Sequence, residues 1–321
     1  MNSGKSKMII ASCPLRVSLL GGSTDLEDFI SKYDYGQVIN FPVNLYTYVS
    51  INKRYDGKYL IQYSKTESVT KISSIKNDLV RVVLEYFNIN TPITVALNAD
   101  IPSHGSGLAS SSSFIIAMIK ATSVFKKLEL SDYEICDIAL ILERKFNPLV
   151  GRQDSLGCGL KGFKHLYFKS NKKLKITPFN NLYFDNHDLY LIPVTKTGRK
   201  STDILKSLGL KERTTICQKV DYGIKYLGDN NFKEFNNLIL KSWEEKKKTS
   251  SLIVTPNILK LEKDIIKTKS PLYYKLCGAG GGGYILLIKE KSINIPLGLL
   301  KRNSYIKINI DNRGIKTWEL N

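Results

Sequence analysis

Residues 100–114 read Asp-Ile-Pro-Ser-His-Gly-Ser-Gly-Leu-Ala-Ser-Ser-Ser-Ser-Phe, a run rich in glycine and serine. Before it, apolar residues alternate over 93–97, which predicts a strand that ends at Asp100. After it, apolar residues recur at helical spacing over 114–125, which predicts a helix beginning near Ser111. A loop in this position points backbone N–H groups and the positive end of a helix dipole at an anion. The pattern indicates a phosphate-binding loop, and the alternative is a flexible loop capped by serine.

The neighbouring segments predict a mixture of helices and strands. Residues 24–27 (Thr-Asp-Leu-Glu) and 131–134 (Ser-Asp-Tyr-Glu) both have the pattern of a capping box. The first predicts a short helix to about Tyr33, and the second predicts a helix that Pro148 stops. The other predicted elements are strands at 45–51, 189–194 and 284–288 and a mostly helical stretch at 201–269. The fold class is therefore α+β.

A second glycine-rich run precedes the predicted strand at 284–288. Gly278, Gly280 and Gly283 match G-x-G-x-x-G, which in dinucleotide-binding folds leads into a helix. Because a strand pattern follows instead, we do not expect a dinucleotide site. Residues 4–6 (Gly-Lys-Ser) lack the upstream glycine of a Walker A loop.

Composition limits the class of protein. The 321 residues are 42% hydrophobic and 24% charged, enough apolar material for a core, and the length suggests two domains or one large domain. No apolar run reaches the 18 or so residues of a membrane-spanning helix, and the first residues lack the features of a secretory signal, so we expect a cytoplasmic protein with no membrane partner. Five cysteines without C-x-x-C spacing indicate free thiols.

The chain is strongly basic. Lysine and arginine number 48 against 29 aspartates and glutamates, giving a net charge of +19. Such an excess fits nucleic acid, a membrane surface or an anionic substrate. The basic residues are spread along the whole chain and no nucleic-acid recognition motif accompanies them, so we expect no nucleic-acid partner.

Six segments, taken in order, resemble motifs of the GHMP small-molecule kinases, which include galactokinase and the homoserine, mevalonate and phosphomevalonate kinases. They extend over nearly the whole chain and are 14–25 (PLRVSLLGGSTD), 100–114 (DIPSHGSGLASSSSF), 151–154 (GRQD), 197–199 (TGR), 243–246 (WEEK) and 275–284 (KLCGAGGGGY). Within that family the set looks most like the D-glycero-D-manno-heptose 7-phosphate kinases.

The resemblance implies a fold and an activity. It implies a ribosomal S5-like N-terminal domain at 1–185, which carries a sugar loop and the ATP phosphate loop, and a ferredoxin-like C-terminal domain at 186–321, which carries the glycine-rich motif. ATP and Mg²⁺ would serve phosphorylation of the anomeric hydroxyl of heptose 7-phosphate, a small-molecule partner, by a monomer or a homodimer. The alternatives are another sugar-1-kinase, for galactose, fucose or an N-acetylhexosamine, and a catalytically silent sugar- or nucleotide-binding sensor.

The resemblance also implies catalytic and metal-binding residues. Asp154 would accept the sugar hydroxyl proton, although on sequence alone it could be a solvated loop carboxylate. Arg16 would steady the transferring phosphoryl group or Asp154, although a surface arginine at a strand edge is as plausible from the sequence. Glu143, otherwise an ordinary surface charge, would bind Mg²⁺ together with Ser111, for which Ser110 or Ser112 could substitute.

The binding residues follow in the same way. The ATP phosphate loop would comprise Gly105, Ser106, Gly107, Leu108, Ala109, Ser110, Ser111 and Ser112. The sugar would contact Arg16, Gly21, Gly22, Ser23, Thr24, Asp25, Asp154, Gly280, Gly281, Arg199 and Lys246, the last two as candidates for the sugar's far phosphate. Asp25 could also complement the dipole of the helix predicted after Thr24, and the two roles can hold together. The chain departs from the family pattern at Ala109 and Ser23, where glycine is common, and at Ser155, where glutamine is frequent.

Overall fold

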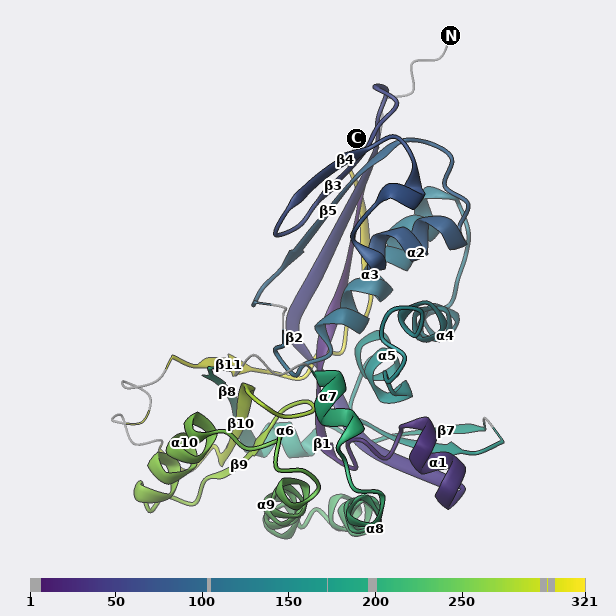
Figure 1. Ribbon diagram of the computed structural model, residues 1–321. Coiled ribbons are helices and arrows are strands. Elements are labelled where there is room, and N and C mark those ends of the chain that lie inside the picture. The colour runs from purple at the N-terminus through teal and green to yellow at the C-terminus, as the bar shows by residue number, and fades with distance from the viewer. Residues whose placement is uncertain are drawn as a thin grey trace.

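The protein has two lobes, each built on a β-sheet with helices packed against it (Figure 1). The structure is a computed structural model that describes residues 7–102, 105–171, 173–195, 201–294, 299 and 304–320. Helix and strand are interspersed along the chain, so the predicted α+β class is confirmed.

The larger sheet forms the first lobe. Its order is β12-β1-β2-β5-β3-β4, with β6 paired to β2 and β7 paired to β6. All described pairs are antiparallel except β3 with β5. The strands are β1 (Met8–Leu20), β2 (Tyr35–Lys53), β3 (Tyr59–Gln62), β4 (Thr66–Val69), β5 (Ile93–Ala99), β6 (Lys164–Lys169), β7 (Leu174–Pro178) and β12 (Lys316–Leu320).

The smaller sheet is antiparallel and has the order β11-β8-β10-β9. Its strands are β8 (His187–Val194), β9 (Tyr273–Leu276), β10 (Gly283–Glu290) and β11 (Ile306–Ile308). The predicted domain boundary at 185/186 falls just before β8. The last described strand, β12, returns to pair with β1 in the larger sheet.

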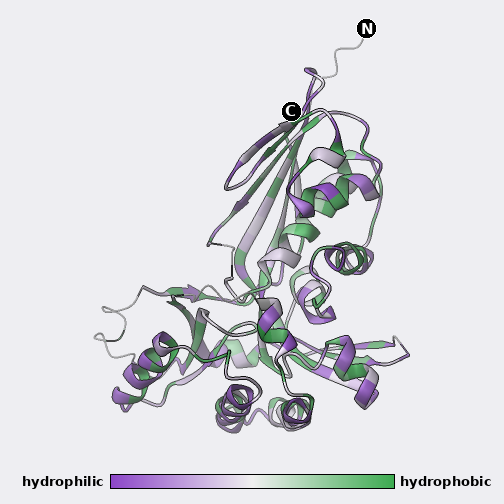
Figure 2. Cartoon of the chain, viewed as in Figure 1, coloured by the Kyte–Doolittle hydropathy of each residue, from purple (hydrophilic) through white to green (hydrophobic). Residues whose placement is uncertain are grey.

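In the first lobe α3 and α5 lie against the larger sheet, and α4 packs on both helices (Figure 1). Helices α9 and α10 contact the smaller sheet, and α8 packs on α9 and on the ends of β1 and β2. In Figure 2 those three carry hydrophilic and hydrophobic stretches side by side, as expected of helices with one buried face. The helices are α1 (Glu27–Tyr33), η1 (Ile72–Ser74), α2 (Asp78–Tyr86), α3 (Ser110–Phe125), α4 (Asp132–Glu143), α5 (Arg152–Gly159), α6 (Leu182–Asn186), α7 (Ser201–Lys206), α8 (Leu210–Gly228), α9 (Phe232–Lys248) and α10 (Pro256–Lys267).

Strand β1 passes from one hydrophobic core to another. Its pairing with β2 shifts register between Pro14 and Leu15, a place where a strand tolerates proline. Cys13, before the shift, packs in the core under α3, whereas Leu15 and Val17 pack in the core shared with the smaller sheet. The residues that follow Pro14 therefore lie where the two lobes meet.

Most predicted elements are present. The predicted strand at 93–97 is β5, the helix after the serine run is α3, and 284–288 lies in β10. The capping box at 131–134 forms: the Glu134 N–H donates to Ser131 Oγ at 3.2 Å, and the Ser131 N–H donates to the Glu134 carboxylate at 2.8 Å. All five cysteines are buried and free. Within the described ranges, no helix has both the length and the apolar character needed to cross a membrane.

The capping box predicted at 24–27 is wrong. Helix α1 begins at Glu27, and its N-cap is Leu26, which makes no side-chain cap bond. The Thr24 hydroxyl instead lies 2.8 Å from the Gly21 carbonyl oxygen and 2.9 Å from that of Gln37. These contacts hold the loop after β1 against β2, so the hydroxyl does not cap the helix.

Candidate active site

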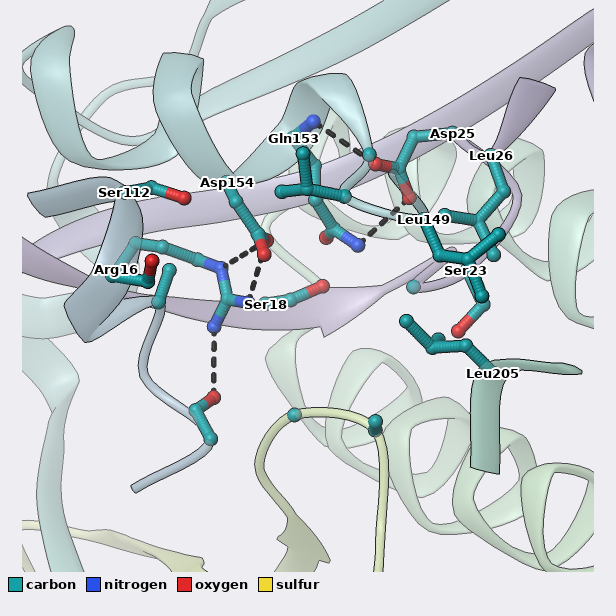
Figure 3. A pocket seen from close by; sticks show the side chains of 18 of the residues that line it. Arg16, Ser18, Ser23, Asp25, Leu26, Ser112, Leu149, Gln153, Asp154 and Leu205 are labelled. Atoms are coloured by element: carbon teal, nitrogen blue, oxygen red, sulfur yellow. Dashed lines mark hydrogen bonds and ion pairs between the residues drawn. The ribbon is translucent and has the colours of Figure 1, made fainter. Parts of the chain in front are cut away.

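A cavity of about 760 Å³ lies where the two lobes meet, and Figure 3 shows part of its lining. It is lined by β1 and the loop after it, by the loop and first turn of α3, by the end of α4, and by the segment that leads into α5. The second lobe contributes α7, α8, α9 and the turn after β9. The phosphate loop belongs to one of the six motif segments, and four of the other five also contribute residues to the cavity.

Arg16 and Asp154 form an ion pair in this cavity. Arg16 is only 4% exposed, and its Nη2 and Nε lie 2.6 and 3.1 Å from Asp154 Oδ1 (Figure 3). Its Nη1 donates to the Gly107 carbonyl at 2.9 Å. Asp154 lies in the first turn of α5, where the helix dipole favours a carboxylate. Arg16 is therefore not a surface arginine, and Asp154 is not a solvated loop carboxylate, so both alternative interpretations are wrong.

Asp25 is held by the backbone and side chain of Gln153. The carboxyl group is 1% exposed, and it accepts the Gln153 N–H at 3.0 Å and the Gln153 Nε2–H at 2.8 Å. Burial raises its pKa to about 6, and the nearby Asp154 charge adds to the rise. A Cβ on Gly151 would lie 1.8 Å from Asp25 Oδ2, so only glycine allows this approach. Asp25 precedes the N-cap of α1, so the predicted dipole role within that helix is wrong.

The loop before α3 has the backbone of an anion cradle. Gly105, Gly107 and Ala109 all have φ between 59° and 77°, in the left-handed region. Ala109 is the N-cap of α3 and makes no side-chain cap bond, so the loop is not capped by serine. An L-residue at such a φ costs free energy that glycine avoids, which explains why glycine would suit position 109.

Gly107 also allows two loops to meet. A Cβ on this residue would lie 2.5 Å from the Cys277 carbonyl oxygen, in the turn that follows β9. We expect Gly107→Ala to lower the free energy of unfolding by about 1–3 kcal/mol and to weaken nucleotide binding, because it combines left-handed strain with a backbone clash. Urea unfolding and calorimetric titration with ATP measure both effects.

Gly57 provides the control for this prediction. It has a similar φ, +73° against +77°, but a Cβ there meets nothing within 4 Å. Gly57→Ala should therefore show the left-handed strain alone and bind ATP as the unsubstituted chain does. If both variants lowered the free energy of unfolding equally, the contact between the two loops at Gly107 would contribute nothing to stability.

Glu143 lies at the end of α4 and is 1% exposed, so its interpretation as a surface charge is wrong. Ser112 Oγ donates to its Oε2 at 2.6 Å. Burial raises the pKa of Glu143 to about 7, while hydrogen bonds from Ser112 and Ser111 oppose the rise. A carboxylate beside two hydroxyls is a hard oxygen donor set that suits Mg²⁺. The described residues contain no cluster of three His, Cys, Asp or Glu side chains fit for a metal, so further ligands would be phosphate oxygens and water.

The remaining predicted residues divide into two groups. Those that line the cavity are Gly22, Ser23, Gly105, Ser106, Gly107, Ala109, Ser110, Ser111, Ser112 and Lys246. Those outside its lining are Gly21, Thr24, Leu108, Gly280 and Gly281, and Arg199 lies outside the described residues.

The predicted residues outside the cavity lining contact neighbouring segments of the chain. A Cβ on Gly21 would lie 1.9 Å from the Gln37 carbonyl oxygen, so glycine lets that loop rest on β2. Leu108 is buried in the core, and the Gly281 N–H donates to Ile253 at 2.9 Å. In the glycine-rich turn it is Gly278 and Ala279 that face the cavity.

Sequence reasoning did not single out Lys275, a second lysine of the cavity. Its Nζ donates to the carbonyls of Ser18 and Leu19, both at 2.8 Å. Burial lowers its pKa to about 7, with the charge of Lys246 as the next cause. Burial likewise lowers the pKa of Lys246 to about 8, with the charge of Arg16 as the next cause. Neither lysine has an ion pair with a carboxylate among the described residues; Lys246 donates to the Gly278 carbonyl, as Lys275 does to the two β1 carbonyls.

The geometry thus combines a carboxylate held by arginine, a buried carboxyl, an anion cradle and two lysines, one buried and one partly exposed. Residues 74–162 match the model of the GHMP kinases N terminal domain. The chain therefore contains a GHMP kinase N-terminal domain. The relatives that match along the chain are kinases, and this protein is a phosphotransferase with an alcohol group as acceptor.

The chain is similar to two curated sugar kinases and shares its fold with a solved heptose-phosphate kinase. It is 27% identical to D-glycero-alpha-D-manno-heptose 7-phosphate kinase of Campylobacter jejuni, over 98% of this chain and 100% of that protein. It is 32% identical to L-fucokinase/L-fucose-1-P guanylyltransferase of Bacteroides fragilis, over 62% of this chain and 22% of that protein. It shares its fold with a D-glycero-D-manno-heptose 1-phosphate kinase of Bacteroides thetaiotaomicron, with a TM-score of 0.76, 21% identity, and coverage of 98% and 99% of the two chains.

Proposed function

We propose that this protein transfers the γ-phosphoryl group of ATP to the anomeric hydroxyl of D-glycero-D-manno-heptose 7-phosphate, giving the 1,7-bisphosphate for nucleotide-activated heptose synthesis. The observation that carries the proposal is the pair of cavity lysines, Lys275 buried and Lys246 partly exposed, neither of which has an ion pair with a carboxylate of the described residues. Buried charge is stable only when it is paired, and a phosphate on the substrate would supply the missing negative charge. The similarity to a heptose 7-phosphate kinase over nearly the whole chain supports the same sugar.

The reaction requires positioning, charge neutralisation and a proton acceptor. Asp154 accepts the proton of the anomeric hydroxyl. The hydroxyl oxygen attacks the γ-phosphorus, and the bond between the γ-phosphorus and the β-phosphate oxygen breaks. Arg16 forms an ion pair with Asp154 and also donates to the Gly107 carbonyl of the phosphate loop. Asp25, fixed from two sides by Gln153, accepts hydrogen bonds from sugar hydroxyls.

The phosphate loop holds the nucleotide. Its left-handed residues and the free N–H groups of the first turn of α3 face the cavity and bind phosphate oxygens. Glu143 would hold Mg²⁺ together with Ser112 or Ser111. When bound, the metal neutralises charge that develops on the phosphate oxygens. We infer that the chain divides into domains at 1–185 and 186–321, with ATP and the sugar bound between them.

Substitutions of the proposed metal ligands test this assignment. We expect Glu143→Gln, Ser112→Ala and Ser111→Ala to raise the Mg²⁺ concentration that gives half-maximal rate and to lower kcat, because each removes one of few protein oxygens available to the metal. Ser123→Ala is the control, since Ser123 lies on the same helix and its hydroxyl donates to the Lys120 carbonyl. The Mg²⁺ dependence of ATP binding, measured by calorimetry, gives a readout apart from the rate. An unchanged Mg²⁺ dependence in all three variants would contradict the assignment.

A panel of sugars tests the proposed substrate. ATP consumption is measured with heptose 7-phosphate, heptose, galactose, L-fucose and N-acetylhexosamines, and the product position is read by NMR. We expect heptose 7-phosphate to be used at least about 10²-fold better than the unphosphorylated sugars, with the phosphate on the anomeric oxygen. Better use of L-fucose would favour a second candidate function, that of an L-fucose kinase, which the similarity to the Bacteroides fragilis L-fucokinase supports. Sugar binding with no ATP consumption for any sugar would indicate a silent sensor.

A further inference from the structure

Gln153 has a buried acceptor atom that no hydrogen bond of the protein uses. The residue lies in the first turn of α5, is 9% exposed and lines the cavity between Asp25 and Asp154 (Figure 3). Its amide nitrogen and its backbone N–H are both committed to Asp25, at 2.8 and 3.0 Å. Its Oε1 is buried and, within the described part of the chain, has no hydrogen-bond partner.

The orientation of this amide follows from chemistry. An ionised carboxylate only accepts hydrogen bonds, so the atom that faces Asp25 must be the nitrogen, and the oxygen must be the atom left over. Most buried polar atoms have a partner, and a buried acceptor without one destabilises the folded state. A donor from outside the protein would satisfy Oε1.

The neighbouring residue limits what that donor can be. Asp154 follows Gln153 on the same helical turn, and the proposed function places the reacting hydroxyl at Asp154. A sugar that presents one hydroxyl to Asp154 has further hydroxyls on adjacent carbons, all of them able to donate. Oε1 itself cannot donate, so it selects for a donor at that point of the sugar.

We propose that Gln153 is a specificity-determining residue whose Oε1 accepts a hydrogen bond from a sugar hydroxyl other than the one phosphorylated. The inference rests on the proposed function, because it takes the reacting hydroxyl to lie at Asp154. Gln153 thereby joins two tasks: its nitrogens orient Asp25, and its oxygen recognises the sugar. A sugar that lacks this hydroxyl leaves the acceptor unsatisfied in the complex and is rejected.

Deoxy analogues test the proposal with the full chain. The 2-deoxy, 3-deoxy and 4-deoxy forms of heptose 7-phosphate, and their deoxyfluoro counterparts, are compared by kcat/KM and by the affinity measured without ATP. In the unsubstituted chain we expect one position to cost about 10- to 100-fold, equally for hydrogen and for fluorine, because fluorine does not donate. In Gln153→Met that loss should shrink to within about threefold, while the losses at other positions persist.

Two further variants make the outcome unambiguous. Gln153→Glu keeps an oxygen at the same place and should retain the selectivity, although its carboxylate lies close to Asp25 and weakens overall binding. Gln62→Met, at an exposed position of β3, should behave as the unsubstituted chain. If Gln153→Met and the unsubstituted chain lost the same kcat/KM with every deoxy analogue, the proposal would be overturned. Gln153 would then be a positioning residue for Asp25.

Failure of the proposed substrate would look different. If the enzyme uses another sugar and not heptose 7-phosphate, the assigned substrate is wrong, and the same series is made from the sugar that is used. Coupling between Gln153 and one hydroxyl of that sugar would support the inference, and its absence would overturn it.

Discussion

Asp154→Asn is expected to lower kcat by about 10²–10⁴, the range of a general-base contribution, and to leave the affinity for ATP little changed. An amide cannot accept the hydroxyl proton at neutral pH. It is close in shape to the carboxylate, so one oxygen can still accept hydrogen bonds from Arg16, and the fold should be retained. Single-turnover kinetics separate chemistry from product release, and calorimetry measures the affinity for ATP.

The control for Asp154→Asn is the same change at Asp185, an exposed residue of α6 outside the cavity. Asp185→Asn should leave kcat unchanged. If Asp154→Asn kept kcat within about threefold while chemistry limited the rate, the hydroxyl proton would have another acceptor. Asp25 would be the next carboxylate to test, since it also lines the cavity.

Local patterns of the sequence were sufficient to predict much of the fold. The strand, loop and helix around residues 100–114 are encoded by adjacent residues, and all three are present. The capping box at 131–134 forms for the same reason. The similar pattern at 24–27 failed because the Thr24 hydroxyl is bonded to Gln37 of β2, a contact that no local pattern reveals.

The site was predicted less completely because it depends on contacts between distant parts of the chain. Asp25 and Gln153 are separated by 128 positions, and only the fold places the amide against the carboxyl. Glu143 reads as a surface residue beside Arg144 and Lys145, whereas the start of α3 covers it. Lys275 was part of a quoted motif, but its chemistry depends on Ser18 and Leu19 of β1.

The two cavity lysines lead to a prediction about the charge of the substrate. A hydrogen bond to a charged group contributes about 1.5–3 kcal/mol, or roughly one to two powers of ten in kcat/KM. We expect Lys246→Met to lower kcat/KM for heptose 7-phosphate by about 10- to 100-fold, and Lys246→Met combined with Lys275→Met to lower it by about 10²–10⁴. The same changes should affect unphosphorylated heptose much less, because it lacks the group that the lysines pair with.

The pH dependence gives a second measurement for Lys246. Its pKa is lowered to about 8, so the free enzyme has the charged ammonium below that pH and loses it above. The preference for the phosphorylated sugar in kcat/KM, which reports on free enzyme, should therefore fall as the pH rises through about 8. In Lys246→Met the fall near pH 8 should be absent, and only the fall caused by Lys275, whose pKa is lowered to about 7, should remain.

Lys248→Met is the matched control, because Lys248 lies on α9 two positions after Lys246 but is exposed and pairs with Glu245. It should preserve the preference for the phosphorylated sugar. Because Lys275 also bonds two β1 carbonyls, urea unfolding of Lys275→Met must show that the fold persists. The decisive comparison is between the two substrates. If the lysine variants lost activity equally with phosphorylated and unphosphorylated heptose and raised KM for ATP, the lysines would serve the nucleotide, and the unpaired charge would no longer argue for a sugar phosphate.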